Sequence, residues 1–460
     1  MAEEKFYHAL KVINEKCIGC THCMTGCPTS AIRIKNGKAT ISADACIDCG
    51  ECMKACPYDA IILEQDDFND IYNFKYRVAL IPAVFIGQFR SKIEEERIYT
   101  EIYKLGFTHV FEVESTVDIL HDAMTKYIDL DIGEKPYISS FCPAIVRLIQ
   151  IRFPSLIDNI IPYRTPVDIA ANYYRKKLLD ERIKEKDIGI FYVTPCASKI
   201  AAVKSPIGEE QSGVDGVINM DLLFNKVYGA IKQAPQYETR LKLDHYLTEK
   251  QVKWSLTGGE SVNFKGRCLA IDEIHNVIAF LEKVENEEIK HVNFLELRAC
   301  DESCCGGVLL SENRFLIGER LKDRAEKYKE CKKIDNRNII GKYRNFLNKN
   351  IKIESPIQER SMHKLDDDMQ MAMTKMQRLN QLMKYLPQID CGACGAPRCK
   401  DLARDIVQEN AKITQCVFLQ KYLGKKNNIS HQDLLKNVEN IWGEKRFDMD
   451  KKNKYESIDD

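Results

Sequence analysis

The 460-residue sequence lacks three features that would assign a protein to a class at once. No uncharged apolar run reaches the ~20 residues that span a bilayer, so a membrane-spanning helix is excluded. Basic and acidic residues balance at 68 each, so no net field indicates nucleic acid or an anionic membrane as a partner. The amino-terminal stretch is polar and lacks the apolar core of a signal peptide. We therefore expect a cytoplasmic protein of about two to four domains.

Cysteine, in contrast, is abundant, with 19 residues. In a long chain without an export signal, cysteines are more often metal ligands or reduced core residues than disulfides. Their spacing decides between these two.

Two four-cysteine motifs lie near the amino terminus. They are "CIGCTHCMTGCP", with Cys17, Cys20, Cys23 and Cys27, and "CIDCGECMKACP", with Cys46, Cys49, Cys52 and Cys56. Their shared C-x2-C-x2-C-x3-C-P spacing resembles that of bacterial two-cluster ferredoxins. The resemblance implies that one 4Fe-4S cube is held by the first three cysteines and Cys56, and the other by Cys46, Cys49, Cys52 and Cys27. A pair of zinc sites is the alternative, which the duplicated order disfavours. We assign residues 1–65 to a two-cluster ferredoxin domain.

A third motif lies near the carboxyl terminus, where Cys391, Cys394, Cys399 and Cys416 follow C-x2-C-x4-C-x16-C spacing. Small residues between them let the backbone wrap closely, and "CKDLARDIVQENA" predicts an amphipathic helix that returns the chain to Cys416. The stretch is similar to the small 4Fe-4S domain of membrane-associated electron-transfer subunits and corrinoid iron-sulfur proteins. We expect a third cube here, with a structural zinc ion as the alternative.

The residues around this motif predict a helix and a tail. Residues 366–388 predict one long helix with a stripe of Met369, Met373, Met376, Leu379 and Met383, which we expect to pack against the protein itself rather than a partner. We assign 355–420 to a helix plus a 4Fe-4S domain. The charged tail, 421–460, either docks as a helix or remains mobile, and we assign it no chemistry.

The central region predicts an α/β domain. "YRVALIPAVF" (76–85), "DIGIFYVTPC" (187–196) and "HVNFLELRAC" (291–300) read as strands, and helical patterns such as "AIVRLIQIRF" and "IHNVIAFLEKV" lie between them. This alternation predicts mainly parallel sheets covered on both faces, with sites at the carboxyl ends of the strands.

Four central cysteines lie near such ends, namely Cys142, Cys196, Cys300 and Cys304. A single buried cysteine is usually a small core hydrophobe. Four of them beside Pro143, Pro195 and the Gly306-Gly307 pair indicate metal ligation instead.

Here the sequence resembles the catalytic domain of iron-only (di-iron) hydrogenases, over residues 75–345. The family's three signature loops have the forms T-S-C-C-P, M-P-C-x-x-K and E-x-M-x-C-x3-C-x-G-G. The matching residues are Ser140, Cys142 and Pro143, then Pro195, Cys196 and Lys199, then Glu296, Cys300, Cys304, Gly306 and Gly307. The flanking cluster domains are also usual accessory domains of this family.

The resemblance implies that the four central cysteines bind a fourth cube, and that the Cys304 sulfur also bridges to a two-iron unit. That unit carries carbonyl, cyanide and a bridging dithiolate amine. Gly306 and Gly307 would leave space for metal beside Cys304. Lys199 would donate a hydrogen bond to an iron-bound cyanide, with a solvated surface lysine as the alternative.

Departures from the family pattern concern proton delivery. Phe141 stands where the family has a proton-relaying cysteine, and Thr194 and Arg298 stand where methionines pack against the di-iron unit. Ala202 replaces an acid. Arg298 changes the electrostatics of the site unless it turns outward or pairs with Glu296, Asp301 or Glu302. The cysteines that would bind the cube are thus all present, whereas the residues that deliver protons in the family are replaced.

Three cysteines are left over, namely Cys268, Cys305 and Cys331. Cys305 is either an alternative proton donor or structural, and we expect the latter.

These features predict a hydrogenase-like protein of the divergent, sensory type, which oxidises or forms hydrogen slowly. The alternative is a multi-cluster electron-transfer protein without the di-iron unit. A scaffold for cluster insertion is a third possibility, without a specific signal. We expect a soluble redox partner, either ferredoxin-like or a signalling protein, because no PAS-like or kinase module is recognisable.

Overall fold

The computed structural model describes residues 7–130, 136–233, 247–330, 340–360, 365–366, 368–425 and 430–446. The chain divides into two compact units. The first unit comprises Met1–Ala9, Ile47–Gly50 and Glu64–Arg360, and the second comprises Leu10–Cys46, Glu51–Leu63 and Ser361–Asp460. No helix of the described residues is both long enough and apolar enough to cross a membrane.

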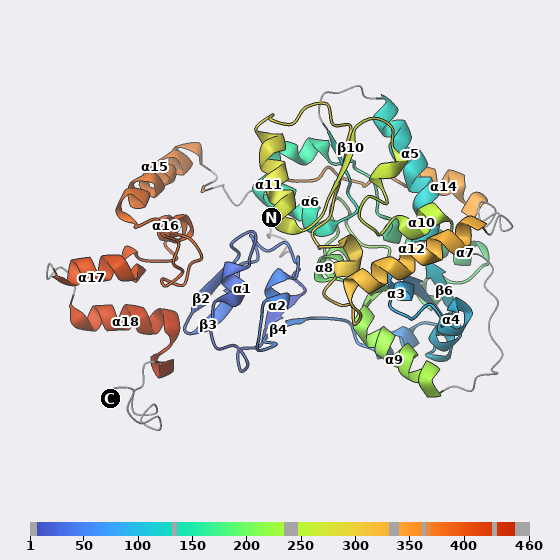
Figure 1. Ribbon diagram of the computed structural model, residues 1–460, viewed down its shortest axis with the longest axis horizontal. Helices are drawn as coiled ribbons and strands as arrows, with labels where there is room; N and C mark the ends of the chain where they lie inside the picture. Colours follow the sequence, from blue (N-terminus) through green and yellow to red (C-terminus); the bar gives the residue numbers. More distant parts are fainter. Residues whose placement is uncertain are drawn as a thin grey trace. The chain divides into compact units, whose positions relative to one another are not determined.

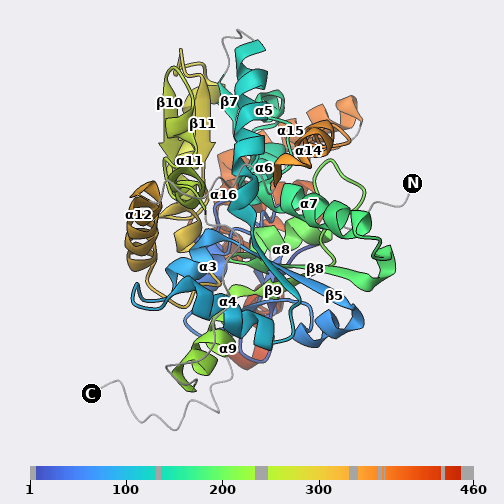
Figure 2. The ribbon, with the colours of Figure 1, turned by 90° about the vertical axis from the view of Figure 1, so that its right-hand side faces the viewer.

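The first unit is built on a parallel sheet of four strands in the order β6-β5-β8-β9. The strands are β5 (Tyr76–Ile81), β6 (His109–Glu112), β8 (Ile188–Thr194) and β9 (Gly216–Asn219). Every residue of β8 is buried, as expected for a parallel strand covered on both faces. Helix α7 (Pro166–Asp180) lies over one face, and α4 (Glu95–Lys104) and α9 (Met220–Gln233) lie over the other (Figure 2).

A second parallel sheet has the order β10-β11-β7. Its strands are β7 (Tyr137–Ile138), β10 (Cys268–Ile271) and β11 (Phe294–Leu297). The crossover between β10 and β11 is α11 (Ile274–Glu285), which Figure 2 shows beside these strands. The α/β class with parallel sheets predicted from the sequence is confirmed.

The remaining helices of the first unit surround the sheets. They are α3 (Ala83–Gly87), α5 (Val117–Leu130), α6 (Pro143–Arg152), α8 (Ala197–Lys204), α10 (Glu249–Lys253), α12 (Arg314–Glu330) and α14 (Arg344–Lys349), with short 3-10 turns η1 (Phe68–Asn73), η2 (Val113–Thr116), η3 (Pro154–Asn159), η4 (Glu185–Asp187), η5 (Ser261–Asn263) and η6 (Ser303–Gly306).

Two predicted strands are too long. The run 76–85 leaves the sheet at Ile81, because Pro82 has no N–H to donate and Ala83 already begins α3. The run 291–300 is a strand only from Phe294 to Leu297. The shortening leaves Arg298 and Cys300 in a loop.

The amino-terminal part of the second unit contains two small antiparallel sheets. β1 (Leu10–Val12) pairs with β4 (Ile61–Leu63), and β2 (Ile32–Lys35) forms a hairpin with β3 (Lys38–Ile41). One-turn helices α1 (His22–Thr25) and α2 (Glu51–Lys54) carry the third cysteine of each motif.

The carboxyl-terminal part of the second unit is helical (Figure 1). It contains α15 (Met369–Tyr385), α16 (Cys399–Val407), η7 (Ile413–Gln415), α17 (Val417–Lys425), α18 (His431–Trp442) and η8 (Glu444–Arg446). The predicted packing of the methionine stripe is confirmed at Leu379 and Met383 but is wrong for Met369, Met373 and Met376, which are 79%, 61% and 45% exposed. Only Leu379 of α15 is buried, within a small core that includes Leu402 of α16.

The tail docks within the second unit through the end of α18. The Asn36 and Gly37 N–H groups of the β2–β3 turn donate to the carbonyls of Asn440 and Ile441, at 2.8 Å each. The indole N–H of Trp442 donates to the carbonyl of Ala393 at 3.2 Å. The residues 430–446 therefore join the third cysteine motif to the ferredoxin-like hairpin.

Candidate metal centre

The four central cysteines line one small cavity in the first unit. Cys142 immediately precedes α6, and Cys196 follows β8 and precedes α8. Cys300 follows β11, and Cys304 lies in η6. Burial raises the pKa of the Cys196 thiol, although the Lys199 ammonium lowers it. The fold thus gathers four thiols from distant parts of the sequence.

Gly306 and Gly307 lie where backbone segments approach one another closely. A Cβ atom on Gly306 would lie 2.0 Å from the Asp301 carbonyl oxygen, and one on Gly307 would lie 2.4 Å from the Pro195 carbonyl oxygen. Both glycines are therefore needed because backbone segments approach so closely there. Gly307 also lines the cavity.

Lys199 reaches the metal site from α8. Its Nζ lies 3.5 Å from the Cys304 sulfur, to which it donates. Burial lowers the pKa of Lys199, but the Cys304 thiolate and nearby groups outweigh burial, so its pKa lies above the ordinary value. Lys199 is thus a half-buried cation beside Cys304, and not a fully solvated surface lysine.

Arg298 lies inside the site, where it is 2% exposed. Its Nη2 donates to Glu260 at 2.7 Å and lies 3.5 Å from a Glu296 oxygen. Of the alternatives left open for Arg298, the structure shows the pairing with Glu296, and Glu260 is an additional partner that was not expected. No motif marks Glu260, since it lies in a loop between α10 and β10.

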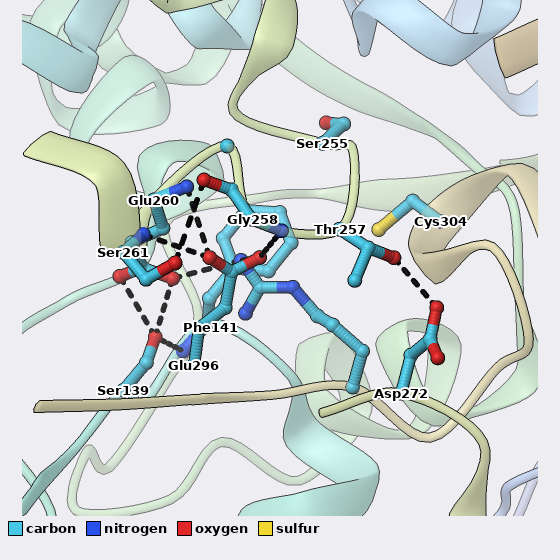
Figure 3. Close-up of polar contacts among 12 residues, drawn as sticks. Ser139, Phe141, Ser255, Thr257, Gly258, Glu260, Ser261, Asp272, Glu296 and Cys304 are labelled. Carbon is cyan, nitrogen blue, oxygen red and sulfur yellow. Dashed lines mark hydrogen bonds and ion pairs between the residues drawn. The ribbon is translucent and has the colours of Figure 1, made fainter. Parts of the chain in front are cut away.

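The two carboxylates are held by further donors (Figure 3). Glu296 accepts from the N–H groups of Gly258, Glu260 and Ser261 at 2.8–3.1 Å. The Ser139 hydroxyl donates to both oxygens of Glu260 at 2.9 Å. Burial raises the pKa of Glu260, whereas Arg298 lowers it, and the net direction is upward.

Arg298 also retains donors that could serve a bound group. Its Nε and Nη1 atoms are buried and have no hydrogen-bond partner among the described residues. Arg298 lines the cysteine cavity, so these donors suit an acceptor-rich group there, such as cluster sulfide or cyanide. The donor set of four thiols, Lys199 and Arg298 therefore fits an iron-sulfur cube with an anionic neighbour.

Thr194 uses its hydroxyl within its own loop. Its Oγ1 donates to the Cys196 carbonyl at 3.1 Å and accepts from the Cys196 N–H at 3.4 Å. It therefore fixes the turn that carries a cavity thiol.

The leftover cysteines do not join this site. Cys305 is 1% exposed and does not line the cavity, and burial raises its pKa. Cys268 is half-buried in β10. Cys331 lies outside the described residues.

A second cavity, of about 510 Å³, adjoins the cavity of the four central cysteines. It shares Phe141, Pro143 and Lys199 with the cysteine cavity. Glu114 and Tyr192 line it as well, and Arg164 and Glu185 are among its charged residues.

Within the second unit, Cys17, Cys20, Cys23 and Cys56 line one pocket. Burial, followed by these neighbouring thiolates, raises the pKa of Cys23 to about 12. Backbone N–H groups of Ala39 and Ala60 donate to the sulfurs of Cys17 and Cys56 at 3.3 Å each. Thiolates that bind a 4Fe-4S cube accept N–H···S hydrogen bonds of this kind.

The cysteines of the second motif are divided between the units. Cys46 and Cys52 belong to the second unit with Cys27, whose sulfur accepts from the Ala31 N–H at 3.2 Å. Cys49 belongs to the first unit, where it lines the cavity of the four central cysteines.

In the carboxyl-terminal motif, Cys399 and Cys416 are buried and Cys394 is half-buried. Burial, with a smaller contribution from the Cys391 and Cys416 thiolates, raises the pKa of Cys394 to about 11. Cys391 is the one exposed cysteine among those that the structure describes.

Comparison with known families agrees with these sites. Residues 75–225 match the family described as iron only hydrogenase large subunit, C-terminal domain. This part of the chain is thus similar to an iron-only hydrogenase domain. Residues 16–61 match the 4Fe-4S dicluster domain, and residues 386–418 match an Fe-S cluster family.

Individual relatives of this hydrogenase domain are distant. Iron hydrogenase 1 of Clostridium pasteurianum is 28% identical over 249 residues, which are 46% of this chain and 42% of that protein. An uncharacterized protein of Methanocaldococcus jannaschii is 33% identical over 81 residues, 18% of this chain and 36% of that protein. The chain thus spans less than half the length of each curated relative. A solved structure of an FeFe-hydrogenase HydA1 variant from Chlamydomonas reinhardtii is 13% identical, covering 65% of this chain and 97% of that one, with a TM-score of 0.48.

Proposed function

We propose that the protein is a cytoplasmic hydrogenase of the divergent, sensory type, which reacts slowly with hydrogen and passes electrons to a soluble partner. The observation that carries this proposal is the single cavity lined by Cys142, Cys196, Cys300 and Cys304, with the Lys199 ammonium 3.5 Å from the Cys304 sulfur. We propose that these four cysteines hold a cube and that Cys304 bridges it to a di-iron unit. When bound, such a unit supplies the metal at which hydrogen is split or formed.

Lys199 and Arg298 would orient and hold this group. Lys199 is half-buried and cationic, so it would donate to an anionic ligand such as cyanide. Arg298 is fixed by Glu260 and Glu296, which leaves its unpartnered Nε and Nη1 as further donors. Phe141 would exclude water and carry no proton.

Three further cubes would connect this site to the partner. We propose that Cys17, Cys20, Cys23 and Cys56 hold one, that Cys27, Cys46, Cys49 and Cys52 hold the next, and that Cys391, Cys394, Cys399 and Cys416 hold the third. Cys49 supports this path, because it lines the central cavity. The exposure of Cys391 supports electron exchange with the partner at the third cube. The corresponding domains are 1–65, 75–345 and 355–420, followed by the tail 421–460.

A multi-cluster electron-transfer protein without the di-iron unit is the second candidate. It is favoured by Arg298, whose buried guanidinium lines the cavity of the cube and can interact with its sulfides alone. In that case Lys199 would serve only the Cys304 thiolate.

Hydrogen-driven reduction separates the two candidates. Protein loaded anaerobically with cubes is treated with a synthetic di-iron precursor and exposed to hydrogen, and cube reduction is followed by electron paramagnetic resonance. Treated protein should be reduced slowly, and untreated protein should not. If treated protein with a full set of cubes stays oxidised, the electron-transfer candidate replaces the hydrogenase.

A further inference from the structure

Glu114 is a buried carboxyl close to the metal site that the proposed function does not use. It lies in η2 directly after β6 and is 1% exposed. One of its oxygens accepts from the Ala83 N–H at 2.9 Å, and the other accepts from the Ser255 hydroxyl at 2.9 Å. Among the described residues it forms no ion pair, so nothing forces the carboxyl to stay charged.

Glu114 changes protonation near neutral pH. Burial, followed by the charge of Glu112, raises its pKa to about 7, although the hydrogen bonds from Ala83 and Ser255 lower it. A group whose pKa lies near the working pH is the most effective for proton exchange.

The position of Glu114 connects solvent to the metal site. It lines the cavity of about 510 Å³ together with Tyr192, Phe141 and Lys199. Phe141 and Lys199 line the cysteine cavity as well. The carbonyl of Ser255 accepts from the Cys304 N–H at 3.4 Å, so the hydroxyl partner of Glu114 also contacts the loop of the bridging cysteine.

The other ionisable groups near Glu114 have partners or surroundings of their own. Glu112 is paired with Arg324 at 2.8 Å, and Lys199 is a cation beside Cys304. Burial raises the pKa of Tyr192, so its phenol stays neutral. Asp168, which also lines the cavity, is engaged at the start of α7 by Thr165.

We propose that Glu114 is the proton-relay residue of this protein, which exchanges protons between solvent in the large cavity and the face of the metal site lined by Phe141 and Lys199. The carboxylate takes one proton from solvent and releases it toward that face, so no electron moves and the carboxylate is regenerated. This relay would replace the thiol that Phe141 lacks. It rests on the proposed function, because it needs a proton-consuming site beside Lys199.

The first test does not need the di-iron unit. Infrared difference spectra of cube-loaded protein between pH 5 and pH 9 should show a protonated carboxyl band that titrates near pH 7 and is absent in Glu114→Gln. Glutamine keeps the shape and can retain both hydrogen bonds. Glu185→Gln is the matched control, since it lies on the same cavity but is exposed. Ser255→Ala should move the midpoint upward, because the lost hydrogen bond favours the charged form. A wild-type protein without such a titration overturns the proposal.

The second test uses turnover. In di-iron-loaded protein, Glu114→Gln should lower the hydrogen turnover rate by ~10²-fold, whereas Glu185→Gln should leave it unchanged. Turnover of Glu114→Gln at the wild-type rate overturns the relay while leaving the hydrogenase function intact.

If no di-iron unit loads, the proposed function fails and the coupling of Glu114 to the site is measured on the central cube. In wild-type protein, a plot of the midpoint potential of this cube against pH should change slope near pH 7. In Glu114→Gln it should not. Identical slopes in both proteins overturn the relay.

Discussion

The guanidinium carbon of Arg298 lies 4.1 Å from the centroid of the Phe141 ring. The Lys199 ammonium lies 4.6 Å from the same centroid, so two cations flank one aromatic side chain. Each such contact stabilises a desolvated pair by ~0.5–2 kcal/mol. Phe141, which has no exchangeable proton, therefore lies close to two cations.

We predict that Phe141→Cys raises hydrogen turnover of di-iron-loaded protein by ~10-fold or more. Arg298 and Lys199 would lower the pKa of the new thiol, which makes it a ready proton donor and acceptor. The measurement is hydrogen evolution with a chemical reductant in excess.

Two controls accompany this variant: its thermal stability is measured, and the buried thiol of Cys305 is removed in a separate variant. Replacing a buried phenylalanine can cost a few kcal/mol, so thermal unfolding is measured alongside turnover. Cys305→Ala should leave turnover unchanged, because Cys305 lines neither cavity. Loss of activity in Cys305→Ala would assign the relay to that thiol instead.

Removing the buried cation should destabilise the first unit strongly. Arg298→Met leaves Glu260 and Glu296 buried without their cation, at a cost of ~3–5 kcal/mol in unfolding free energy. The pKa of Glu260 rises further without the guanidinium, so the deficit should grow as the pH rises above ~4.3, where the unfolded carboxyl loses its proton.

The double variant Arg298→Met with Glu260→Gln is the matched control. It removes one of the two unpaired carboxylates and should recover part of the lost stability. Thermal unfolding from pH 5 to pH 8 checks both variants. An Arg298→Met protein as stable as wild type at every pH would contradict the ion-pair account.

The raised pKa of Glu114 should appear in stability as well. Between pH ~4.3 and about 7 the folded protein keeps the Glu114 proton and the unfolded chain loses it, so wild-type stability falls as the pH rises. The loss amounts to up to about 4 kcal/mol. Glu114→Gln should therefore gain stability relative to wild type between pH 5 and pH 8, as measured by anaerobic thermal unfolding. If the stability difference between Glu114→Gln and wild type were the same at pH 5 and at pH 8, it would contradict the raised pKa of Glu114.

Iron content tests the cluster assignments. Protein reconstituted anaerobically should bind about sixteen irons, four in each of four cubes. Cys391→Ala should lose about four of them and keep the spectrum of the ferredoxin-like cubes. About twelve irons with one zinc ion in the wild-type protein would contradict a third cube at Cys391, Cys394, Cys399 and Cys416.

The parallel α/β class was predictable from the sequence, because β8 and its neighbours are short apolar runs between amphipathic helices. It also found the cysteines that now line common pockets, since cysteine spacing is a local property of the chain. Strand ends were less accessible, because the exit at Pro82 depends on which residue first leaves the sheet ladder.

Long-range pairing was not readable from the sequence. Glu260 is 38 residues away from Arg298, and no spacing rule links a loop acid to a buried arginine. Glu114 reads as an ordinary acid at a strand end until the fold buries it beside Ser255. The exposure of Met369, Met373 and Met376 in α15 was not predicted, because periodicity identifies an apolar face but not what covers it.

Infrared spectroscopy tests the central assignment most directly. Protein with its full set of cubes, co-expressed with hydrogenase maturases or treated with a synthetic di-iron precursor, should show sharp bands of iron-bound carbonyl and cyanide. These bands should vanish in Cys304→Ala, which removes the bridging sulfur, and should shift in Lys199→Ala, which removes the donor beside it. A wild-type protein with all of its cubes and no carbonyl or cyanide bands would contradict a di-iron unit at Cys304.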